Sequence, residues 1–280
     1  MQPETVKKLF GADNPEISVI IPTMRTEDQL QALIDGIRSQ TVTSLEVIIA
    51  YRFSPSGRAR NAGAAIAAGR HLVFMDDDIG LGDENVISNL CRTLESDDSI
   101  GLAGASTMIP PDANRFQKRI ASEVPRMVYP VVEQIADSDM VTTQCWGQRR
   151  KNYEEIGAFT ETIERGVDPE YRHRVRSADY RVVIAPNTWT YHPPPRDLQS
   201  FMKQTYRNGR ASARAQRHHP ELVVPVPDSG EGGNSKEFGL MGRVFRSVLR
   251  IGEGLLRFRF LQVCERLIYG LGYIAGRLYK

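Results

Sequence analysis

The chain has 280 residues, of which 41% are hydrophobic and 25% are charged, and this composition excludes a disordered or fibrous protein. Its length allows one large domain or two modest ones. The net charge of +2 is unevenly distributed, because residues 238–280 carry eight Arg and Lys against two acids and leave a mildly acidic body. A basic end of this kind indicates contact with an anionic surface, either a membrane or a nucleic acid.

Cysteine usage and apolar runs limit the cellular setting that we expect. Three widely spaced cysteines (Cys91, Cys145 and Cys264) match no metal-ligand pattern and predict no disulfide framework, which fits a reducing compartment. The N-terminal segment lacks the apolar core of a signal peptide, and no window of 18 apolar residues occurs. We therefore expect neither a secretory leader nor a membrane-spanning helix.

Short apolar runs alternate with helical patterns through the N-terminal half. Each run is rich in β-branched residues and ends at a turn, so the pattern predicts four strands: Ile17–Pro22, Leu45–Ala50, His71–Met75 and Ile100–Ser106. Strand and helix alternate with short loops, which predicts an α/β fold with a largely parallel sheet.

The C-terminal half is less regular. Short helices are expected between Thr107 and Asp139, followed by strands at Met140–Trp146 and Tyr180–Ala185. A helix is expected to start near Pro169, and a longer one to span Asp197–Arg217. Segment 218–237 is rich in Pro, Gly and charge and reads as a linker or mobile loop. The predicted division is a domain at 1–217, this linker, and a basic amphipathic helical region at 238–280.

Three consecutive aspartates follow the third predicted strand. In open parallel sheets, ligands bind beyond the carboxyl ends of the strands, where Asp76, Asp77 and Asp78 fall. Hard divalent cations prefer carboxylate oxygens and bridge protein to phosphate. Taken alone, three acids in a loop are more often a solvated turn than a binding site.

Further motifs stand around this triplet in a familiar order. The stretches ISVIIPTMR, GRARNAG, LVFMDDD, IGAFTE, DPEYRHRV and YH together resemble the family-two glycosyltransferases, which are inverting enzymes of the GT-A fold. The resemblance covers roughly residues 17–209. It implies a Rossmann-like α/β catalytic domain at 1–217, with a mixed, mostly parallel sheet flanked by helices, and amphipathic helices after it. It also implies a nucleotide-sugar donor and Mn²⁺ or Mg²⁺.

The resemblance also implies residue roles. Asp168 matches the catalytic base, Asp78 and His192 match the metal site, and Asp76 matches the acid that faces the ribose or donor sugar, whereas Asp77 is expected to point away. The remaining donor-binding candidates are Pro22, Thr23, Arg25, Tyr51, Arg60 and Asn61.

Elementary chemistry supports these roles. A metal neutralises the charge that builds on a departing diphosphate, and inversion needs one base to take the proton of the acceptor hydroxyl.

The chain departs from the family pattern in two places. No acid occurs in Ala50–Gly57, where the family contacts the nucleotide base, and Val167 replaces a common Glu, so Glu164 or Glu170 would supply the nearby charge.

Weaker signals concern contacts with the diphosphate or the acceptor. The candidates are Trp146, Arg174, Gln204 and Arg207. Arg207 belongs to a stripe of basic residues at helical spacing, which is also typical of a solvated face. Trp146 and Trp189 fit a core position better than a sugar platform.

The basic C-terminal region is amphipathic. Its apolar stripe comprises Met241, Val244, Phe245, Val248 and Leu255, and its basic stripe comprises Arg243, Arg246, Arg250 and Arg257. This pattern favours an anionic membrane surface over nucleic acid, for which no recognition motif appears. The alternative is that the apolar face packs on the catalytic domain or on another subunit in a homo-oligomer. We expect a cytoplasmic protein that is peripheral on the inner face of the membrane.

The resulting hypothesis is a metal-dependent inverting glycosyltransferase that acts on a lipid-linked or cell-surface glycan acceptor, as in polysaccharide biosynthesis. One alternative is a sugar-phosphate nucleotidyltransferase, although PTMRTEDQ lacks the glycines usual after the first strand of such enzymes. Another is a non-catalytic scaffold of the same fold at the membrane, which the two departures would favour.

Overall fold

The computed structural model describes residues 5–124, 126–218 and 240–278, without the side chains of 218 and 240–247. The chain forms two compact units, unit 1 (Met1–Met108 and Tyr129–His192) and unit 2 (Ile109–Val128 and Pro193–Lys280). The long helix expected at 197–217, within the predicted domain 1–217, belongs to unit 2, because it packs along the last helix of the chain, 260–278. The predicted linker 218–237 lies outside the described residues from 219 onwards.

Unit 1 contains the predicted alternation of strands and helices. Its strands are β1 (Thr5–Gly11), β2 (Ile17–Thr23), β3 (Leu45–Tyr51), β4 (His71–Met75), β5 (Gly80–Leu81), β6 (Ile100–Met108), β7 (Ala136–Asp137), β8 (Cys145–Arg149) and β9 (Arg181–Tyr191). Its helices are the short 3-10 helix η1 (Glu27–Leu30), α1 (Gln31–Arg38), α2 (Ser56–Ile66), α3 (Val86–Ser96), α5 (Arg150–Ile156) and α6 (Val167–Ser177).

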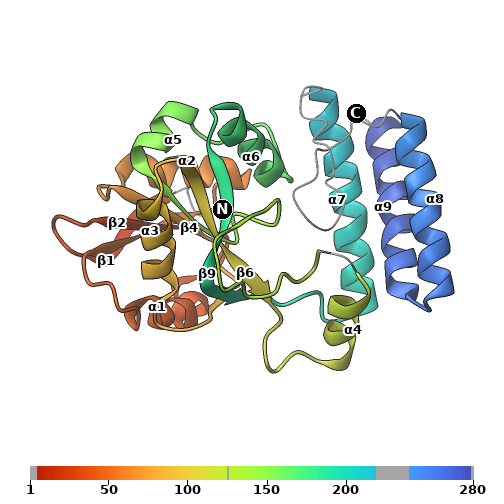
Figure 1. Ribbon diagram of the computed structural model, residues 1–280, viewed down its shortest axis with the longest axis horizontal. Coiled ribbons are helices and arrows are strands. Elements are labelled where there is room, and N and C mark those ends of the chain that lie inside the picture. The colour runs from red at the N-terminus through yellow and green to blue at the C-terminus, as the bar shows by residue number, and fades with distance from the viewer. Residues whose placement is uncertain (1–4, 125, 219–239, 279–280) are drawn as a thin grey trace. The chain divides into compact units, whose positions relative to one another are not determined.

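Within the described residues, the strands form one nine-stranded sheet with the order β1-β3-β2-β4-β8-β6-β9-β5, and β7 pairs with β9 off this path. β2 is parallel to β3 and to β4, and β6 is parallel to β9. β8 lies antiparallel between β4 and β6, so these two strands also share a direction. The predicted α/β fold with a mixed, mostly parallel central sheet flanked by helices is confirmed (Figure 1).

The two faces of β4 pack against different layers, because alternate side chains of a strand point to opposite faces. Val73 and Met75 join an aliphatic core with residues of α1 and α3, such as Ile34 and Leu90. Phe74, between them, joins an aromatic cluster with Trp146, Tyr153, Phe159 and Tyr171. Both faces of the central strand β4 are therefore covered. The chain leaves these covering layers only after Met75, at the carboxyl end of the strand.

Two predicted strands differ in extent from the observed ones. β8 begins at Cys145 instead of Met140 and continues through Gln148 and Arg149, which are polar but buried. Arg149 donates to the carbonyls of Asp98 and Ile100, at 2.8 and 3.0 Å, and these bonds compensate its burial. β9 runs through Pro186 to Tyr191, with a register shift and a positive φ of 49° at Asn187, whereas the prediction ends at Ala185.

Unit 2 is helical in its described parts. It contains α4 (Arg115–Glu123), α7 (Leu198–His218), α8 (Leu240–Leu256) and α9 (Phe260–Leu278). The helix α9 approaches α7 closely through glycines: a Cβ on Gly272 would overlap the backbone carbonyl of Tyr206, and one on Gly209 would overlap that of Tyr269. In the described part of the chain, no helix has the length and apolar character needed to cross a membrane.

Two glycines of α9 give a matched test of this packing. Gly272→Ala should destabilise unit 2 by about 1–3 kcal/mol, because the backbones must separate to admit the methyl group. Gly270→Ala should stabilise by about 0.5–1 kcal/mol, because nothing lies within 4 Å of a Cβ there and alanine favours helix. Thermal unfolding of both variants measures the difference. Equal shifts in Tm would contradict the close contact.

Candidate functional site

Four chain segments end at one edge of the sheet in unit 1. The strands β2, β3 and β4 end there at Thr23, Tyr51 and Met75. Because β8 is antiparallel to β4, with Cys145 opposite Met75, the residues that precede β8 lie at the same edge. The backbone N–H of Asp76 donates to the carbonyl of Gln144 at 3.0 Å, which fixes the start of the aspartate triplet against this segment.

Asp76 is paired with a buried arginine. Nη2 of Arg60, on α2, lies 2.6 Å from Oδ1 of Asp76. The Arg60 side chain is buried, and its Nε and Nη1 have no hydrogen-bond partner in the structure. Buried guanidinium nitrogens are ordinarily satisfied, so Arg60 retains donor capacity next to Asp76.

Negative charge is concentrated around Asp76. Its pKa is raised chiefly by burial, and the carboxylates of Asp168 and Asp78 raise it further, while Arg60 and His192 act in the opposite direction. The backbone contact of Asp76 with Gln144 and the side-chain contact of Thr143 with Asp168 place both acids at this edge. Carboxylates that are close together in this way repel one another, so a positive ligand beside them would relieve the repulsion.

Asp77 does not point away, which corrects the expectation from sequence. Its Oδ2 accepts a hydrogen bond from Oγ1 of Thr23 at 2.5 Å, and its backbone carbonyl accepts one from Nη1 of Arg25 at 3.0 Å. Thr23 Oγ1 also accepts from the backbone N–H of Arg25 at 2.9 Å. Asp77 therefore ties the loop after β2 to the loop after β4.

Asp78 and His192, the two residues expected to bind a metal, lie close together, with 3.5 Å between Oδ1 of Asp78 and Nε2 of His192. Two backbone contacts bring them close. Gly80 in β5 pairs with Tyr191 in β9, and the N–H of His192 donates to the carbonyl of Met108 at 2.9 Å. Across the described ranges, no group of three or more His, Cys, Asp or Glu side chains could hold a metal ion.

Asp168 lies in the first turn of α6, which follows Gly166 at a positive φ of 82°. Its Oδ1 accepts hydrogen bonds from Oγ1 and N of Thr143, at 2.7 and 3.2 Å. Thr143 belongs to the segment before β8, so this contact brings the start of α6 to the same edge as the aspartate triplet. Sequence reasoning missed Thr143 and Gln144, because neither belongs to a recognisable motif.

Other donor-binding candidates have different surroundings. Asn61 uses its side chain internally: Nδ2 donates to the carbonyl of Phe159 and to Glu161, while Oδ1 accepts from Tyr153 and from the N–H of Phe159. It positions the 159–161 loop beside Arg60. Pro22 is part of β2 and pairs with Ala50.

Tyr51, at the end of β3, is half-buried, and burial together with Glu27 raises the pKa of its hydroxyl. Trp146 is fully buried, with its ring stacked on Phe159 at a centroid distance of 6.0 Å. It is therefore a core residue, as the sequence favoured, and not a ligand contact.

Arg174, a predicted candidate for ligand contact, is engaged in internal contacts. Its guanidinium donates to the carbonyls of Ile156 and Ala158, and Nε lies 2.6 Å from Oε1 of Glu170. Glu170 is buried and also accepts from Thr160. Its charge is thus compensated by Arg174 and holds the α5–α6 connection together.

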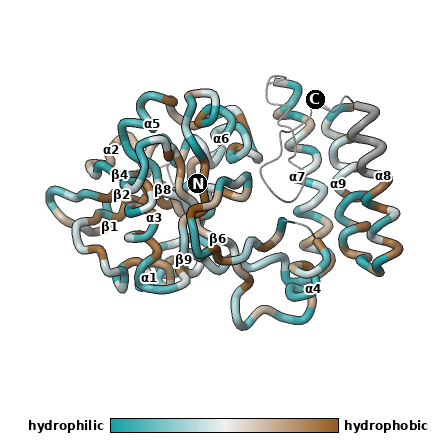
Figure 2. Tube along the Cα trace, in the orientation of Figure 1, coloured by the Kyte–Doolittle hydropathy of each residue, from teal (hydrophilic) through white to brown (hydrophobic). Residues whose placement is uncertain are grey.

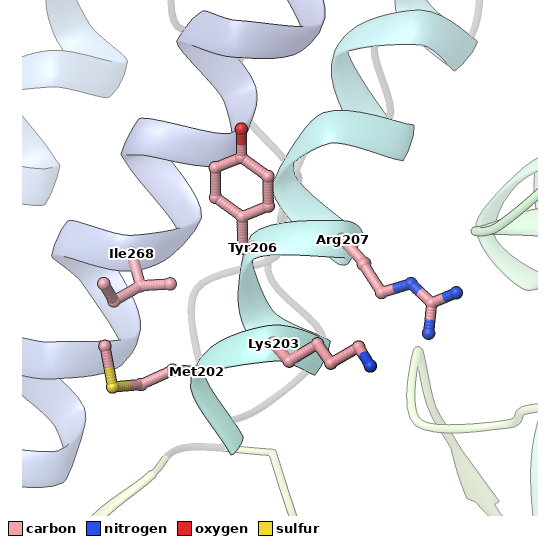
Figure 3. A pocket seen from close by; sticks show the side chains of 5 residues that line it. All are labelled: Met202, Lys203, Tyr206, Arg207 and Ile268. Atoms are coloured by element: carbon pink, nitrogen blue, oxygen red, sulfur yellow. The ribbon is translucent and has the colours of Figure 1, made fainter. Parts of the chain in front are cut away.

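Gln204 and Arg207 lie on α7 in unit 2 and are exposed. Arg207 lines a shallow groove of about 400 Å³ with Met202, Lys203, Tyr206 and Ile268. Figure 3 shows Lys203 and Arg207 extending to one side of α7, while Met202 lies near Ile268 of α9. The groove thus combines cationic and apolar side chains within one unit.

Comparison with solved structures identifies the fold. The mannosyltransferase PcManGT from Pyrobaculum calidifontis, solved with GDP-Man and Mn²⁺, matches with a TM-score of 0.59 at 12% identity, over 99% of this chain and 91% of that one. GalNAc-T7, solved with UDP, GalNAc and Mn²⁺, matches with a TM-score of 0.50 at 12% identity, over 76% of this chain and 52% of that one. This chain thus matches about half of the GalNAc-T7 chain.

Residues 1–349 of S. aureus TarS match with a TM-score of 0.49 at 12% identity, over 95% of this chain and 93% of that one. No protein-family model and no curated protein sequence matches the chain. The shared architecture is the GT-A fold, as the sequence predicts.

The internal role assigned to Arg174 can be tested by stability. Arg174→Met should cost roughly 3 kcal/mol, because it leaves the buried Glu170 carboxylate without a counter-charge. The matched variant Arg176→Met removes a more exposed pair with Asp139 and should cost at most about 1 kcal/mol. Denaturant unfolding measures both. A loss of ligand binding in Arg174→Met without a loss of stability would contradict the assignment.

Proposed function

We propose that this protein is a metal-dependent inverting glycosyltransferase of the family-two type, which transfers a sugar from a nucleotide-sugar donor to an acceptor hydroxyl. The observation that carries the proposal is the convergence of Asp76, Asp78, Asp168 and His192 at the carboxyl edge of a GT-A sheet. The solved structures of PcManGT and GalNAc-T7, which share this fold, contain Mn²⁺ together with a sugar nucleotide or its parts, which supports a similar ligand here.

Asp78 and His192 are the residues that would hold the divalent cation. A carboxylate oxygen and an imidazole nitrogen 3.5 Å apart fit two neighbouring ligands of one ion. Two protein ligands suit Mg²⁺ or Mn²⁺, because such ions commonly keep waters and take their remaining oxygens from substrate phosphates. When bound, the cation supplies charge stabilisation for the departing nucleoside diphosphate.

Asp168 is the proposed general base. Its carboxylate would take the proton of the acceptor hydroxyl as the new glycosidic bond forms, so no covalent bond to the protein is needed. The two hydrogen bonds from Thr143 occupy Oδ1 and leave Oδ2 as the oxygen for this proton. Holding the carboxylate at Oδ1 also restricts its rotation, which favours a reactive geometry.

Asp76, Arg60 and the Thr23–Arg25–Asp77 contacts form the proposed donor side. The unpartnered nitrogens of Arg60 are suited to an anionic or hydroxyl-rich ligand beside Asp76. Tyr51, at the neighbouring strand end, offers an aromatic ring for the nucleotide base. Because no acid follows β3, the nucleotide preference would depend on Tyr51 and nearby hydroxyls instead of a carboxylate.

For the acceptor, we propose a lipid-linked or cell-surface glycan precursor. The groove on α7 and α9 supports this class, because Lys203 and Arg207 can pair with phosphate while Met202 and Ile268 offer apolar contact. Gln204, which precedes Tyr206 on the same helix, is a further candidate for polar contact with this acceptor.

The base assignment is tested by Asp168→Asn. The amide keeps an acceptor for Thr143 but cannot take a proton at neutral pH, so transfer should fall by roughly a thousandfold. Binding of the donor with Mn²⁺, measured by calorimetry, should be nearly unchanged. Asp13→Asn, at an exposed acid, is the control. Full turnover by Asp168→Asn would refute the role of Asp168 as the base.

A separate product analysis of the unaltered protein tests the alternative enzyme class. Formation of a sugar nucleotide from a sugar phosphate and a nucleoside triphosphate would indicate a nucleotidyltransferase.

The metal assignment is tested by Asp78→Ala. Mn²⁺-dependent binding of GDP or UDP should weaken by at least about tenfold, because the cation loses its only proposed charged ligand. Asp77→Asn is the comparison variant: it removes a neighbouring charge and keeps an acceptor for Thr23, and any loss of nucleotide binding through the donor side should be the same with and without Mn²⁺. Calorimetric titrations with and without Mn²⁺ compare the two. Equal losses in both variants would show a general charge effect and not a metal ligand.

A further inference from the structure

Most of the exposed large apolar side chains in the described residues belong to unit 2. Of the seventeen that are exposed in the described part of the chain, thirteen belong to unit 2, although unit 1 contains more residues. They lie on α7, α8 and α9 and in the turn between the last two. Exposed apolar surface on this scale marks a site of interaction with a protein or a membrane.

The most exposed group lies in the turn between α8 and α9, which we call the α8–α9 tip (residues 255–260). Leu256 is 83% exposed and Phe258 is 73% exposed, and Leu255 and Phe260 are each more than half exposed. The rings of Phe258 and Phe260 lie 6.2 Å apart in an edge-to-face arrangement. The turn that joins α8 to α9 can be followed in Figure 2, where the trace is coloured by residue hydropathy.

The backbone of the tip makes the phenylalanine unusual. The N–H of Arg259 donates to the carbonyl of Gly254 at 2.7 Å, and that of Phe258 donates to Leu255 at 3.2 Å. These two hydrogen bonds form a Schellman motif at the end of α8. Phe258, with a φ of 55°, is the residue of the motif that adopts the left-handed conformation. Glycine is the residue favoured there, because a side chain is strained at positive φ. A bulky residue at this strained, exposed position indicates a use for its side chain outside the helix pair.

Charge at the tip indicates the partner. Arg257 and Arg259 alternate with the apolar residues. The sequence of α7, α8, α9 and the turn contains twelve Arg and Lys against two Glu. Two copies joined tip to tip would bring like charges together, whereas an anionic bilayer offers both an apolar layer for the phenylalanines and phosphates for the arginines.

We propose that the α8–α9 tip inserts into the interfacial region of an anionic phospholipid bilayer. Leu256 and Phe258 are the apolar anchors, and Arg257 and Arg259 contact lipid phosphates. The proposal does not depend on the transfer reaction, because the tip belongs to unit 2 and shares no residue with the proposed catalytic site in unit 1. It assigns membrane contact to one short turn, in place of the whole apolar face of the C-terminal region.

Sedimentation of the full chain with vesicles tests the proposal. The protein should bind vesicles of phosphatidylcholine mixed with phosphatidylglycerol more tightly than vesicles of phosphatidylcholine alone, and added salt should weaken binding. Binding that is absent, or that is equal on the two kinds of vesicle, would overturn it.

Phe258→Gly is the decisive variant, because glycine is the preferred residue for this helix ending and the helix pair should fold at least as well. Its vesicle affinity should fall roughly tenfold, as expected for the loss of one inserted aromatic side chain. Ile66→Gln removes an apolar side chain that is 50% exposed from α2 in unit 1, and this variant should bind vesicles like the unaltered protein. Circular dichroism and Tm confirm the fold of both.

Two further outcomes separate the partners. In Phe258→Trp, the indole fluorescence should shift to shorter wavelength when anionic vesicles are added, and an unchanged spectrum would contradict insertion. The mass in solution, from light scattering, should be the same for the unaltered protein and Phe258→Gly. A dimer that Phe258→Gly converts to monomer would overturn the proposal in favour of an interface between two copies.

Discussion

The antiparallel pairing of β8 with β4 is the contact on which the arrangement of acidic residues depends. It places Cys145 opposite Met75 and joins the N–H of Asp76 to the carbonyl of Gln144. Thr143 then stands at the same edge and holds Asp168 through its hydroxyl and its N–H. An acid from a helix far along the chain is thereby brought beside the aspartates that follow a central strand.

Charge crowding gives this edge its chemical character. Asp78 and Asp168 both act on Asp76, and the compensating groups within the site are the buried Arg60 and, when protonated, His192. Natural folds keep such acids together only where other groups hold them, and here Thr23, Arg25 and Thr143 do so. The arrangement is costly for stability and suited to binding a cation with an anionic ligand, which is the usual compromise between folding and activity at functional sites.

The two units use different means to hold their elements together. Unit 1 relies on buried β-branched strands and an aromatic cluster. Unit 2 joins α7 to α9 through glycines that allow the helix backbones to approach closely, so long apolar side chains on the other helix faces are not needed for this contact. Those side chains remain exposed and are available for an external partner, and the strained Phe258 lies among them.

The sequence alone determined the alternation of strands and helices, the position of the aspartate triplet at a strand end, and the order of motifs that indicated a GT-A fold, because these depend on local periodicity and residue type. Tertiary structure decided the rest. Arg174 and Asn61 were candidates for ligand contact in the linear sequence, yet their hydrogen-bond partners are residues elsewhere in the chain that satisfy them internally. The sequence did not predict that β9 extends past Pro186, or that the polar residues of β8 form a buried strand. The hydrogen bonds that stabilise both segments come from residues elsewhere in the fold. The role of Asp77 likewise became visible only once β2 and β4 lay side by side.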